Sequence, residues 1–364
     1  MAEFLLGGFI EIDLAIMGQV VLLGFIGGIL SGFIGSGGAF FMTPGMMNLG
    51  IPGDISVASN ITHKFGKAMV GSRRHGELGN VDKRLGAFLI VTAFVGIQIA
   101  VWINNMLFEE GGDGHGGGAG AASNLYISMV FICILSLVAV SLLRDALRPR
   151  DEQHAQGPSM KIANFVAGLQ LPPYVYFPVA NVRVSLWVLM GVGLATGYLA
   201  GTIGVGGFIG VPAMIYVFGV PTAVATGTEL YLAMFMGGFG ALSYAYHGYV
   251  DIRLTMLLYL GSLVGLYIGA YGTKVVKEVM IRIVTGTVIL ICVLSRAVAV
   301  PMYLRQLGWT ETDPAWDKYF NGASKALLFL AGISGCVIIL TNVIRAYRER
   351  RRIQSSLMEA KASA

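Results

Sequence analysis

Seven apolar runs dominate this sequence, and each is long enough to cross the hydrocarbon core of a bilayer as an α-helix. Such a core, about 30 Å thick, takes about 20 helical residues. The runs lie near residues 14–34, 85–107, 125–143, 185–203, 254–273, 283–300 and 326–344, and two more polar segments of helical length lie at 55–75 and 222–246. We therefore predict an all-α polytopic membrane protein.

Composition and charge agree with this class. Charged residues make up 12% of the chain, against roughly 25% in soluble domains. The net charge of +5 comes from short basic clusters between apolar runs, with no aromatic-interleaved basic face, so we expect membrane lipid and no nucleic acid as a partner. The three cysteines lie singly within apolar runs, and we expect no metal, no cofactor and no redox role.

The chain also matches itself at an offset that brings Gly24 onto Gly193, and this register recovers after a one-residue slip behind the glycine break. At this offset the block GNVDKRL at 79–85 meets GYVDIRL at 248–254, and Gly50 and Pro52 meet Gly219 and Pro221. Eight upstream residues coincide in all, which are Gly24, Gly28, Leu30, Gly32, Ile34, Gly35, Gly37 and Gly38 with Gly193, Gly197, Leu199, Gly201, Ile203, Gly204, Gly206 and Gly207. Self-similarity of this kind indicates a duplicated unit.

A glycine break interrupts the first apolar run of each unit, and a short apolar stretch follows it at 39–51 or 208–219. Twelve helical residues reach only about 18 Å, which is too short to cross a bilayer but sufficient to return from its middle. We therefore predict that helix, break and short helix form one re-entrant hairpin in each unit.

The predicted organisation is a first repeat, a linker, a second repeat and one additional span. The segments are the first repeat 1–147 (hairpin 14–51, spans 55–76, 83–107 and 124–146), a cytoplasmic linker 148–183, the second repeat 184–300 (hairpin 185–219, spans 222–246, 252–274 and 280–300), an extracytoplasmic loop 301–321, an extra C-terminal span 322–346 and a basic cytoplasmic tail 347–364.

Charge bias supports the hairpins, because short cytoplasmic loops are enriched in Lys and Arg. With hairpins, eighteen basic residues face the cytoplasm and five, Arg296 among them, face outside. If 14–34 were instead a full span and 39–51 a loop, the linker would change sides and its basic residues would lie outside. The N-terminus is then predicted outside and the C-terminus in the cytoplasm, and the odd number of crossings inverts the second repeat relative to the first.

The two glycine breaks are candidate ligand sites, because irregular backbone at membrane depth is tolerated only where it is buried in protein or lines a wet cavity. A short helix that begins at the break points its unpaired N–H groups at a ligand, which suits a small oxyanion. The residues are Ser36, Gly37 and Gly38 in the first unit and Val205, Gly206 and Gly207 in the second. Packing is the alternative role for glycine, and we favour it for Gly24, Gly28 and Gly32, which have the spacing of helix interfaces.

The polar helices supply further candidates. In the first, Asn60, His63, Lys64 and Lys67 share one face, and Lys64 is placed to bind an anion because an ionisable residue at that depth indicates function. Thr62 completes this set, and the second helix offers Thr226, Thr228 and Glu229. Snorkelling to the membrane surface is the alternative for the lysines. Glu229 either pairs with Lys64 as a structural bridge or carries a proton. Asp82 and Asp251 are expected to be helix N-caps.

These motifs resemble those of the TauE/SafE family of probable sulfite and organosulfonate exporters. The likeness rests on SGFIGSGGAFFMTP, ISVASNITHK and GNVDKRL in the first unit, and on AGTIGVGGFIGVP, AVATGTE and GYVDIRL in the second. The resemblance implies transport of a small sulfur-containing oxyanion, such as sulfite or sulfoacetate, across the bacterial cytoplasmic membrane, usually outward.

We therefore expect a secondary transporter that works by alternating access, with a small anion as its substrate and a homodimer as an open option. A passive anion channel is the alternative. A membrane-embedded enzyme is less favoured, because the glycine clusters lack the soluble βαβ context of a dinucleotide site and no catalytic residues are predicted.

Overall fold

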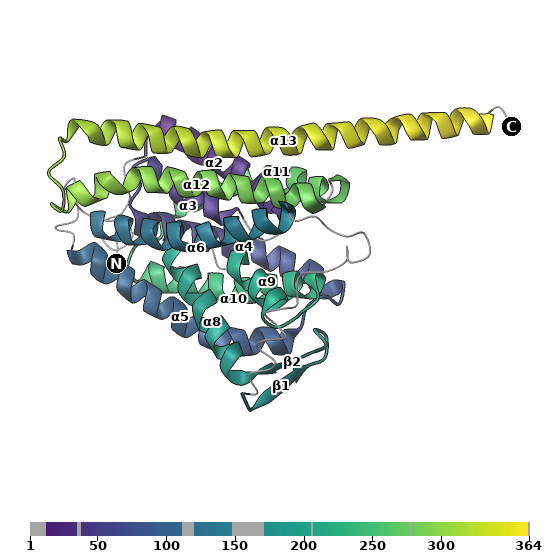
Figure 1. Cartoon of the computed structure of the whole chain (residues 1–364), viewed down its shortest axis with the longest axis horizontal. Helices are drawn as coiled ribbons and strands as arrows, with labels where there is room; N and C mark the ends of the chain where they lie inside the picture. Colours follow the sequence, from purple (N-terminus) through teal and green to yellow (C-terminus); the bar gives the residue numbers. More distant parts are fainter. Residues whose placement is uncertain are drawn as a thin grey trace.

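A computed structural model describes residues 12–34, 38–110, 120–147, 171–204, 207–276 and 278–362 of the chain. These residues form a bundle of helices that lie side by side, with a short β-hairpin at one end (Figure 1). The helices are α2 (Leu14–Ile34), α3 (Ala39–Asn48), α4 (Gly53–Glu77), α5 (Lys83–Glu110), α6 (Ala121–Leu147), α8 (Leu186–Ile203), α9 (Gly207–Tyr216), α10 (Thr222–Tyr246), α11 (Ile252–Val275), α12 (Glu278–Gln306) and α13 (Ala315–Ala362).

Seven of the described helices are long and apolar enough to cross a membrane, so the chain is a polytopic membrane protein. They are α2, α5, α6, α8, α11, α12 and α13. The sequence also predicts seven full spans, but the two sets differ. The predicted set contains the more polar α4 and α10, each 25 residues long, in place of α2 and α8. The helices α3 and α9 have 10 residues each and reach about 15 Å.

Glycines bring pairs of helices into backbone contact. A Cβ atom on Gly24 would lie 2.6 Å from the carbonyl oxygen of Leu258, and one on Gly28 would lie 2.5 Å from that of Ser262. These contacts pack α2 against α11, and Gly197 packs α8 against α5 at Ala93 in the same way. The prediction that the upstream glycines serve helix packing is confirmed.

The same contacts give the directions of the helices. Gly24 and Gly28 meet Leu258 and Ser262 in ascending order, so α2 and α11 run parallel. In contrast, α4 and α10 run antiparallel, because Gly240 faces Ile61 whereas Leu230 faces Gly71. The offset that brings Gly24 onto Gly193 also brings both ends of α4 onto the ends of α10, as expected of a duplicated unit.

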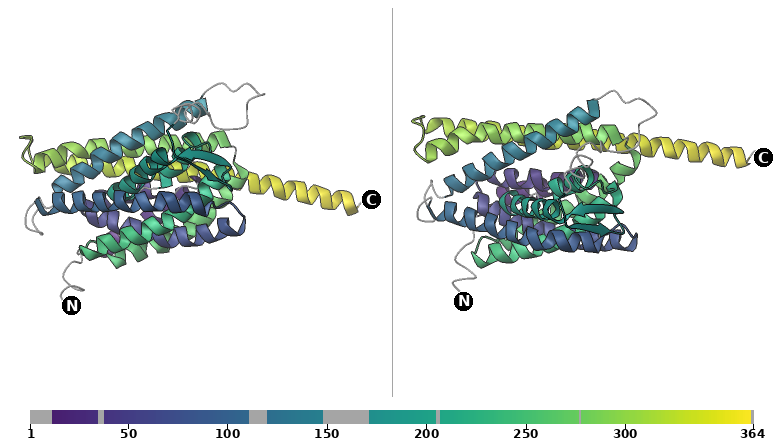
Figure 2. Two further views of the ribbon diagram at one scale, coloured as in Figure 1. Left: turned by 90° about the horizontal axis from the view of Figure 1, so that it is seen from below. Right: turned by 60° about the horizontal axis from the view of Figure 1, so that its bottom comes forward.

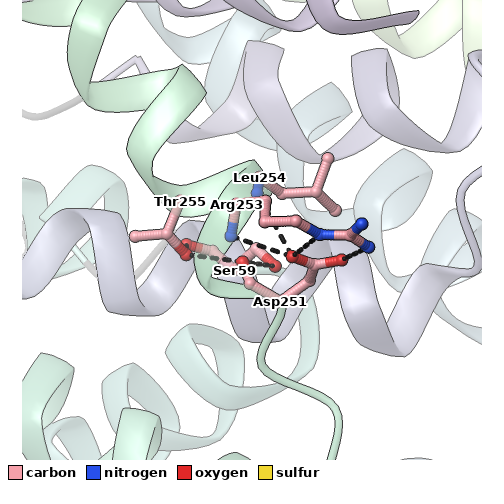
Figure 3. A network of polar contacts seen from close by, with 5 residues as sticks. All are labelled: Ser59, Asp251, Arg253, Leu254 and Thr255. Atoms are coloured by element: carbon pink, nitrogen blue, oxygen red, sulfur yellow. Dashed lines mark hydrogen bonds and ion pairs between the residues drawn. The ribbon is translucent and has the colours of Figure 1, made fainter. Parts of the chain in front are cut away.

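Two N-caps join helix starts to the neighbouring unit. Asp251 caps α11 by accepting from the backbone N–H of Arg253 at 2.9 Å, and its own carbonyl accepts from Ser59 of α4 at 3.5 Å (Figure 3). Asp82 caps α5 by accepting from the N–H of Leu85 at 3.0 Å, and its own N–H donates to Thr228 of α10 at 3.0 Å. Ser59 and Thr228 occupy matching positions of the two repeats, so the two contacts join matching residues, although through different backbone groups of the two aspartates. The N-cap prediction for both aspartates is confirmed.

The linker contains a β-hairpin that the sequence did not predict. Strands β1 (Tyr174–Phe177) and β2 (Val182–Ser185) pair antiparallel, and the N–H groups of Val179 and Ala180 at the turn donate to the Asp82 carboxylate at 3.1 and 3.0 Å. The hairpin therefore lies at the end of the bundle where α5 begins. We call this the basic end, because exposed cations gather there, which are Arg73, Arg74, Lys83, Arg84 and Arg183.

The helices extend past the predicted boundaries at the C-terminal side. The helix α12 continues through Pro301 to Gln306, so only 307–314 of the predicted loop 301–321 lie between α12 and α13. The helix α13 continues to Ala362 through the predicted tail, where the sequence has no Gly or Pro. Figure 2 shows α13 projecting beyond the end of the bundle that carries β1 and β2.

Alanine at Gly28 should destabilise the fold. Its Cβ would lie 2.5 Å from the carbonyl oxygen of Ser262, and overpacking of this kind costs about 1–3 kcal/mol. Thermal unfolding of purified protein should show a lowered midpoint for Gly28→Ala. Gly18→Ala is the matched control on the same helix, since nothing lies within 4 Å of its Cβ position. Equal midpoints for the two variants would contradict the packing argument.

Candidate functional site

The two glycine breaks lie only partly within the described residues. Ser36, Gly37, Val205 and Gly206 are outside them. The structure does place the flanking residues, with Gly38 directly before α3, Gly204 directly after α8, and Gly207 as the first residue of α9.

The break of the second unit meets the first unit's polar helix. Thr43 of α3 donates to the carbonyl of Ile203 at 3.1 Å, and the Asn60 amide of α4 donates to the Thr43 hydroxyl at 2.7 Å. Gly204, with φ of +74°, lies against both side chains: a Cβ atom there would be 3.0 Å from Asn60 Nδ2 and 3.2 Å from Thr43 Oγ1. Asn60 is fully buried and its Oδ1 has no partner, so this corner retains a free acceptor.

The structure gives Gly38 a role in packing, whereas the sequence suggested that this glycine gives a ligand access to the backbone. A Cβ atom at this position would overlap the carbonyl oxygen of Gly27 on α2. Since α3 folds back directly against α2 at this point, only glycine fits. The first break therefore needs Gly38 for the turn itself, whatever its N–H group contacts.

The polar side chains of α4 point to different neighbours. His63 lies 2.7 Å from the Ser262 hydroxyl of α11, with its ring 4.7 Å from that of Tyr259. Lys67 donates to Ser31 of α2 at 2.6 Å, so it points into the bundle and does not snorkel. Thr62 bonds its own helix at Ala58. Lys64 is partly exposed and has no hydrogen bond or ion pair among the described residues, so its ammonium group is free for a ligand.

Glu229 of α10 is the ionisable candidate of the second polar helix. Its side chain is 3% exposed, and neither carboxylate oxygen has a hydrogen-bond partner. The carboxylate lies against the backbone of Gly210 in α9. The carboxylate and the Lys64 ammonium form no ion pair within the described part of the chain, so of the two roles expected for Glu229, a direct bridge to Lys64 is not seen.

A buried carboxylate without a partner is costly, because the charge loses its water and gains no compensating hydrogen bond. Groups of this kind are rare in folded proteins and call for a specific explanation. Glu229 is the repeat equivalent of Asn60 in the first unit. The two units therefore place an amide and a carboxylate at matching positions, each beside a broken helix.

The two threonines of α10 are engaged elsewhere. The Thr228 hydroxyl accepts the N–H of Asp82 at 3.0 Å, and Thr226 donates to the carbonyl of Thr222 one turn earlier at 2.9 Å. The first contact holds the start of α5, and the second is an ordinary local bond in a helix. Among the described residues, neither hydroxyl forms a hydrogen bond with a residue that flanks a glycine break.

Sequence reasoning missed Thr43 and Gly204, which join the two units. The available signals were weak: Thr43 is a polar residue within an apolar stretch, and Gly204 precedes the repeated double glycine. The bond from Thr43 to Ile203 spans 160 residues of sequence. Spacing along one chain cannot predict such a contact.

The burial of one arginine was also not predicted. Arg296, counted among the basic residues that face outside, is 1% exposed within α12. It donates to the hydroxyls of Ser324 at 3.1 Å and Tyr303 at 3.3 Å. Ser324 also donates to Asn48 at 3.0 Å, so this network holds the last residue of α3 against α12 and α13.

The seven apolar helices of membrane-spanning length define the class as a polytopic membrane protein. A family model described as "Sulfite exporter TauE/SafE" matches residues 20–296. The chain belongs to this family of membrane transporters. The match covers both units and ends within α12, so α13 is additional to it.

Curated relatives carry the same kind of name. Two proteins of Bacillus subtilis (strain 168) are "Probable membrane transporter protein YjnA", 23% identical over 75% of this chain and 96% of the relative, and "Probable membrane transporter protein YunE", 25% identical over 75% and 94%. A third, "Probable membrane transporter protein YdhB", is 23% identical over 72% and 93%. No solved structure matches the chain significantly.

Removing the Thr43 hydroxyl should weaken the junction between the units. Thr43→Val keeps the shape but leaves the Asn60 amide and the Ile203 carbonyl without this partner, and buried groups left unpaired cost about 1–3 kcal/mol. We expect a lower thermal midpoint in detergent. Thr62→Val is the control, because that hydroxyl bonds only within its own helix at 2.7 Å. A Thr43→Val midpoint no lower than that of Thr62→Val would refute the junction.

Proposed function

We propose that the protein is a secondary transporter for a small sulfur-containing oxyanion, such as sulfite or an organosulfonate, which it exports by alternating access. The observation that carries this proposal is the free Lys64 ammonium together with the buried, unpartnered Glu229 carboxylate, beside helices that break within the bundle. A structural role would have paired these two charges. Without such a pair, the ammonium group is available to an anion and the carboxylate to a proton.

The arrangement of the two units supports an inverted repeat. Equivalent helices α4 and α10 run antiparallel, and the two cap contacts of Asp82 and Asp251 are exchanged between units. Inverted repeats with broken helices are common in secondary transporters, where the substrate binds at the interface of the repeats. Each short helix, α3 or α9, ends at the loop that starts the polar helix of its own unit, which fits a re-entrant hairpin.

The orientation follows from charge. The basic end carries the exposed cations and the β-hairpin, and we assign it to the cytoplasm of a bacterial inner membrane. The beginning of α2 then lies outside.

The anion would meet several donors at the centre. The N-termini of α3 and α9 are one source, because the first N–H groups of a helix favour anions. Lys64 supplies the charge, Asn60 donates to the carbonyl of Ala39 at the start of α3, and His63 contacts Ser262 of α11. The sulfur oxyanion class comes from the family description and is consistent with a site of backbone donors and one lysine.

Glu229 gives the proposal its coupling step. A carboxylate in a dry site is most stable when protonated, and an anion that binds to Lys64 would favour that form further. Opening toward the basic end would expose the carboxyl group and allow proton exchange. A passive channel needs no such group.

The decisive experiment is transport in vesicles reconstituted with the full chain. An imposed pH gradient should drive sulfite or sulfoacetate uphill, and Glu229→Gln should lose this pH drive while still binding the anion. Downhill flux alone, unaffected by Glu229→Gln, would establish the passive channel instead.

Lys64 should be required for binding. Lys64→Met should weaken anion affinity at least about tenfold, because a charge-assisted contact contributes about 1.5–3 kcal/mol, and the protein should still elute as a folded species. Titration calorimetry with the same anions measures the change. Lys318→Met, which removes an exposed lysine of α13, serves as the control and should bind normally. Unchanged affinity in Lys64→Met would remove Lys64 from the site.

A further inference from the structure

A cavity lies at the basic end, between the helix pair α4 and α10 and the start of α5. It has a volume of about 380 Å³ and lies between the last turns of α4, the start of α5 and the first half of α10. The residues that matter for its chemistry are Met69, Arg73, Val81, Lys83, Tyr231 and Met234. We call it the basic groove.

The basic groove is separate from the candidate transport site. Successive residues of a helix are turned by about 100°, so Tyr231 projects about 200° away from Glu229 around α10. Glu229 faces α9, whereas Tyr231 packs against Gly86 of α5. The side chain of Met69 is 46% exposed and that of the adjacent Val70 is 74% exposed. Large exposed apolar residues on a helix of a membrane-embedded bundle face lipid, so the groove opens toward the membrane.

The groove is cationic toward its surface end and apolar toward its deep end. Lys83 is the first residue of α5, and Arg73 lies four residues before the end of α4, about 6 Å from it. Met69 lies about 12 Å from the same end. Met234 is the thirteenth residue of α10, so it also lies deep. This gradient matches the polarity of a phospholipid that stands with its headgroup at the membrane surface.

The cations are available to a headgroup. Arg73 is 85% exposed, and its Nε lies 3.4 Å from Glu77, which is also 3.7 Å from Arg74. Exposed pairs of this kind are worth about 0–1 kcal/mol, so a phosphate can compete for the guanidinium group. Glu77 also offsets only one of the three neighbouring cations Arg73, Arg74 and Lys83. Basic pockets between helices on the cytoplasmic side bind anionic headgroups in this way.

We propose that the basic groove binds an anionic phospholipid of the cytoplasmic leaflet, with the phosphate between Arg73 and Lys83 and an acyl chain against Met69 and Met234. The lipid touches α4 and α5 of the first unit and α10 of the second. It therefore stabilises the contact between the units at the basic end. The inference depends on the membrane orientation and not on the transported anion.

The test is native mass spectrometry of the purified full chain, titrated with phosphatidylglycerol or with phosphatidylcholine of the same acyl chains, together with the thermal midpoint. The wild type should retain phosphatidylglycerol preferentially and be stabilised by it. Arg73→Gln/Lys83→Gln should lose at least about tenfold in affinity, the scale of one charge-assisted contact. Arg74→Gln/Arg84→Gln removes the same charge from the same end but not from the groove, and should bind as the wild type does.

Other outcomes would overturn the proposal. Equal retention of both lipids by the wild type, or equal loss of phosphatidylglycerol in both double variants, would leave only a nonspecific charge effect. Displacement of the lipid by millimolar inorganic phosphate would identify a site for a free anion. If the groove double variant does not fold, Met69→Trp fills the deep end without changing charge. Met69→Trp should also lose the lipid, and normal lipid retention by this variant would refute the proposed position of the acyl chain.

Discussion

The close approach of helix backbones at glycine determines how the two units interlock. Gly24 and Gly28 bring α2 onto α11, and Gly197 brings α8 onto α5, so each broken helix packs along a span of the other unit. In lipid there is little hydrophobic force between helices, and van der Waals contact at small residues has to provide the association. A side chain at these positions would push the helices apart.

This interlocking has a direct consequence for the polar contact of Thr43 with Ile203 and Asn60. Because α8 is held along α5, its last carbonyl at Ile203 comes within 3.1 Å of Thr43 in the first unit. The carbonyls freed at a helix end need partners when water is absent, and the Thr43 hydroxyl supplies one. The end of α8 is therefore stabilised by the opposite unit, and this polar contact forms only when both units are packed together.

The sequence was most informative where one residue type has one physical role. Glycine spacing predicted the packing of α2, and Asp82 and Asp251 were predicted as caps, because local backbone chemistry governs both. It was least informative for contacts made across the fold, such as Thr43 with Ile203 or Arg296 with Ser324. An arginine in an apolar run is more often near a membrane surface than inside a bundle. The burial of Arg296 could therefore be recognised only from the positions of α3 and α13. The β-hairpin was missed for the same reason, since Asp82 holds its turn from 97 residues away.

Equivalent positions in the two units carry different chemistry, and this difference divides their roles. Asn48 ends α3 and is held by Ser295 and Ser324 of α12 and α13. The short helix of the first unit is thus anchored to the last span of the second unit and to α13. The second unit instead places the buried Glu229 carboxylate against α9. A change in the charge of Glu229 would therefore act on α9, while Asn48 holds α3 to α12 and α13.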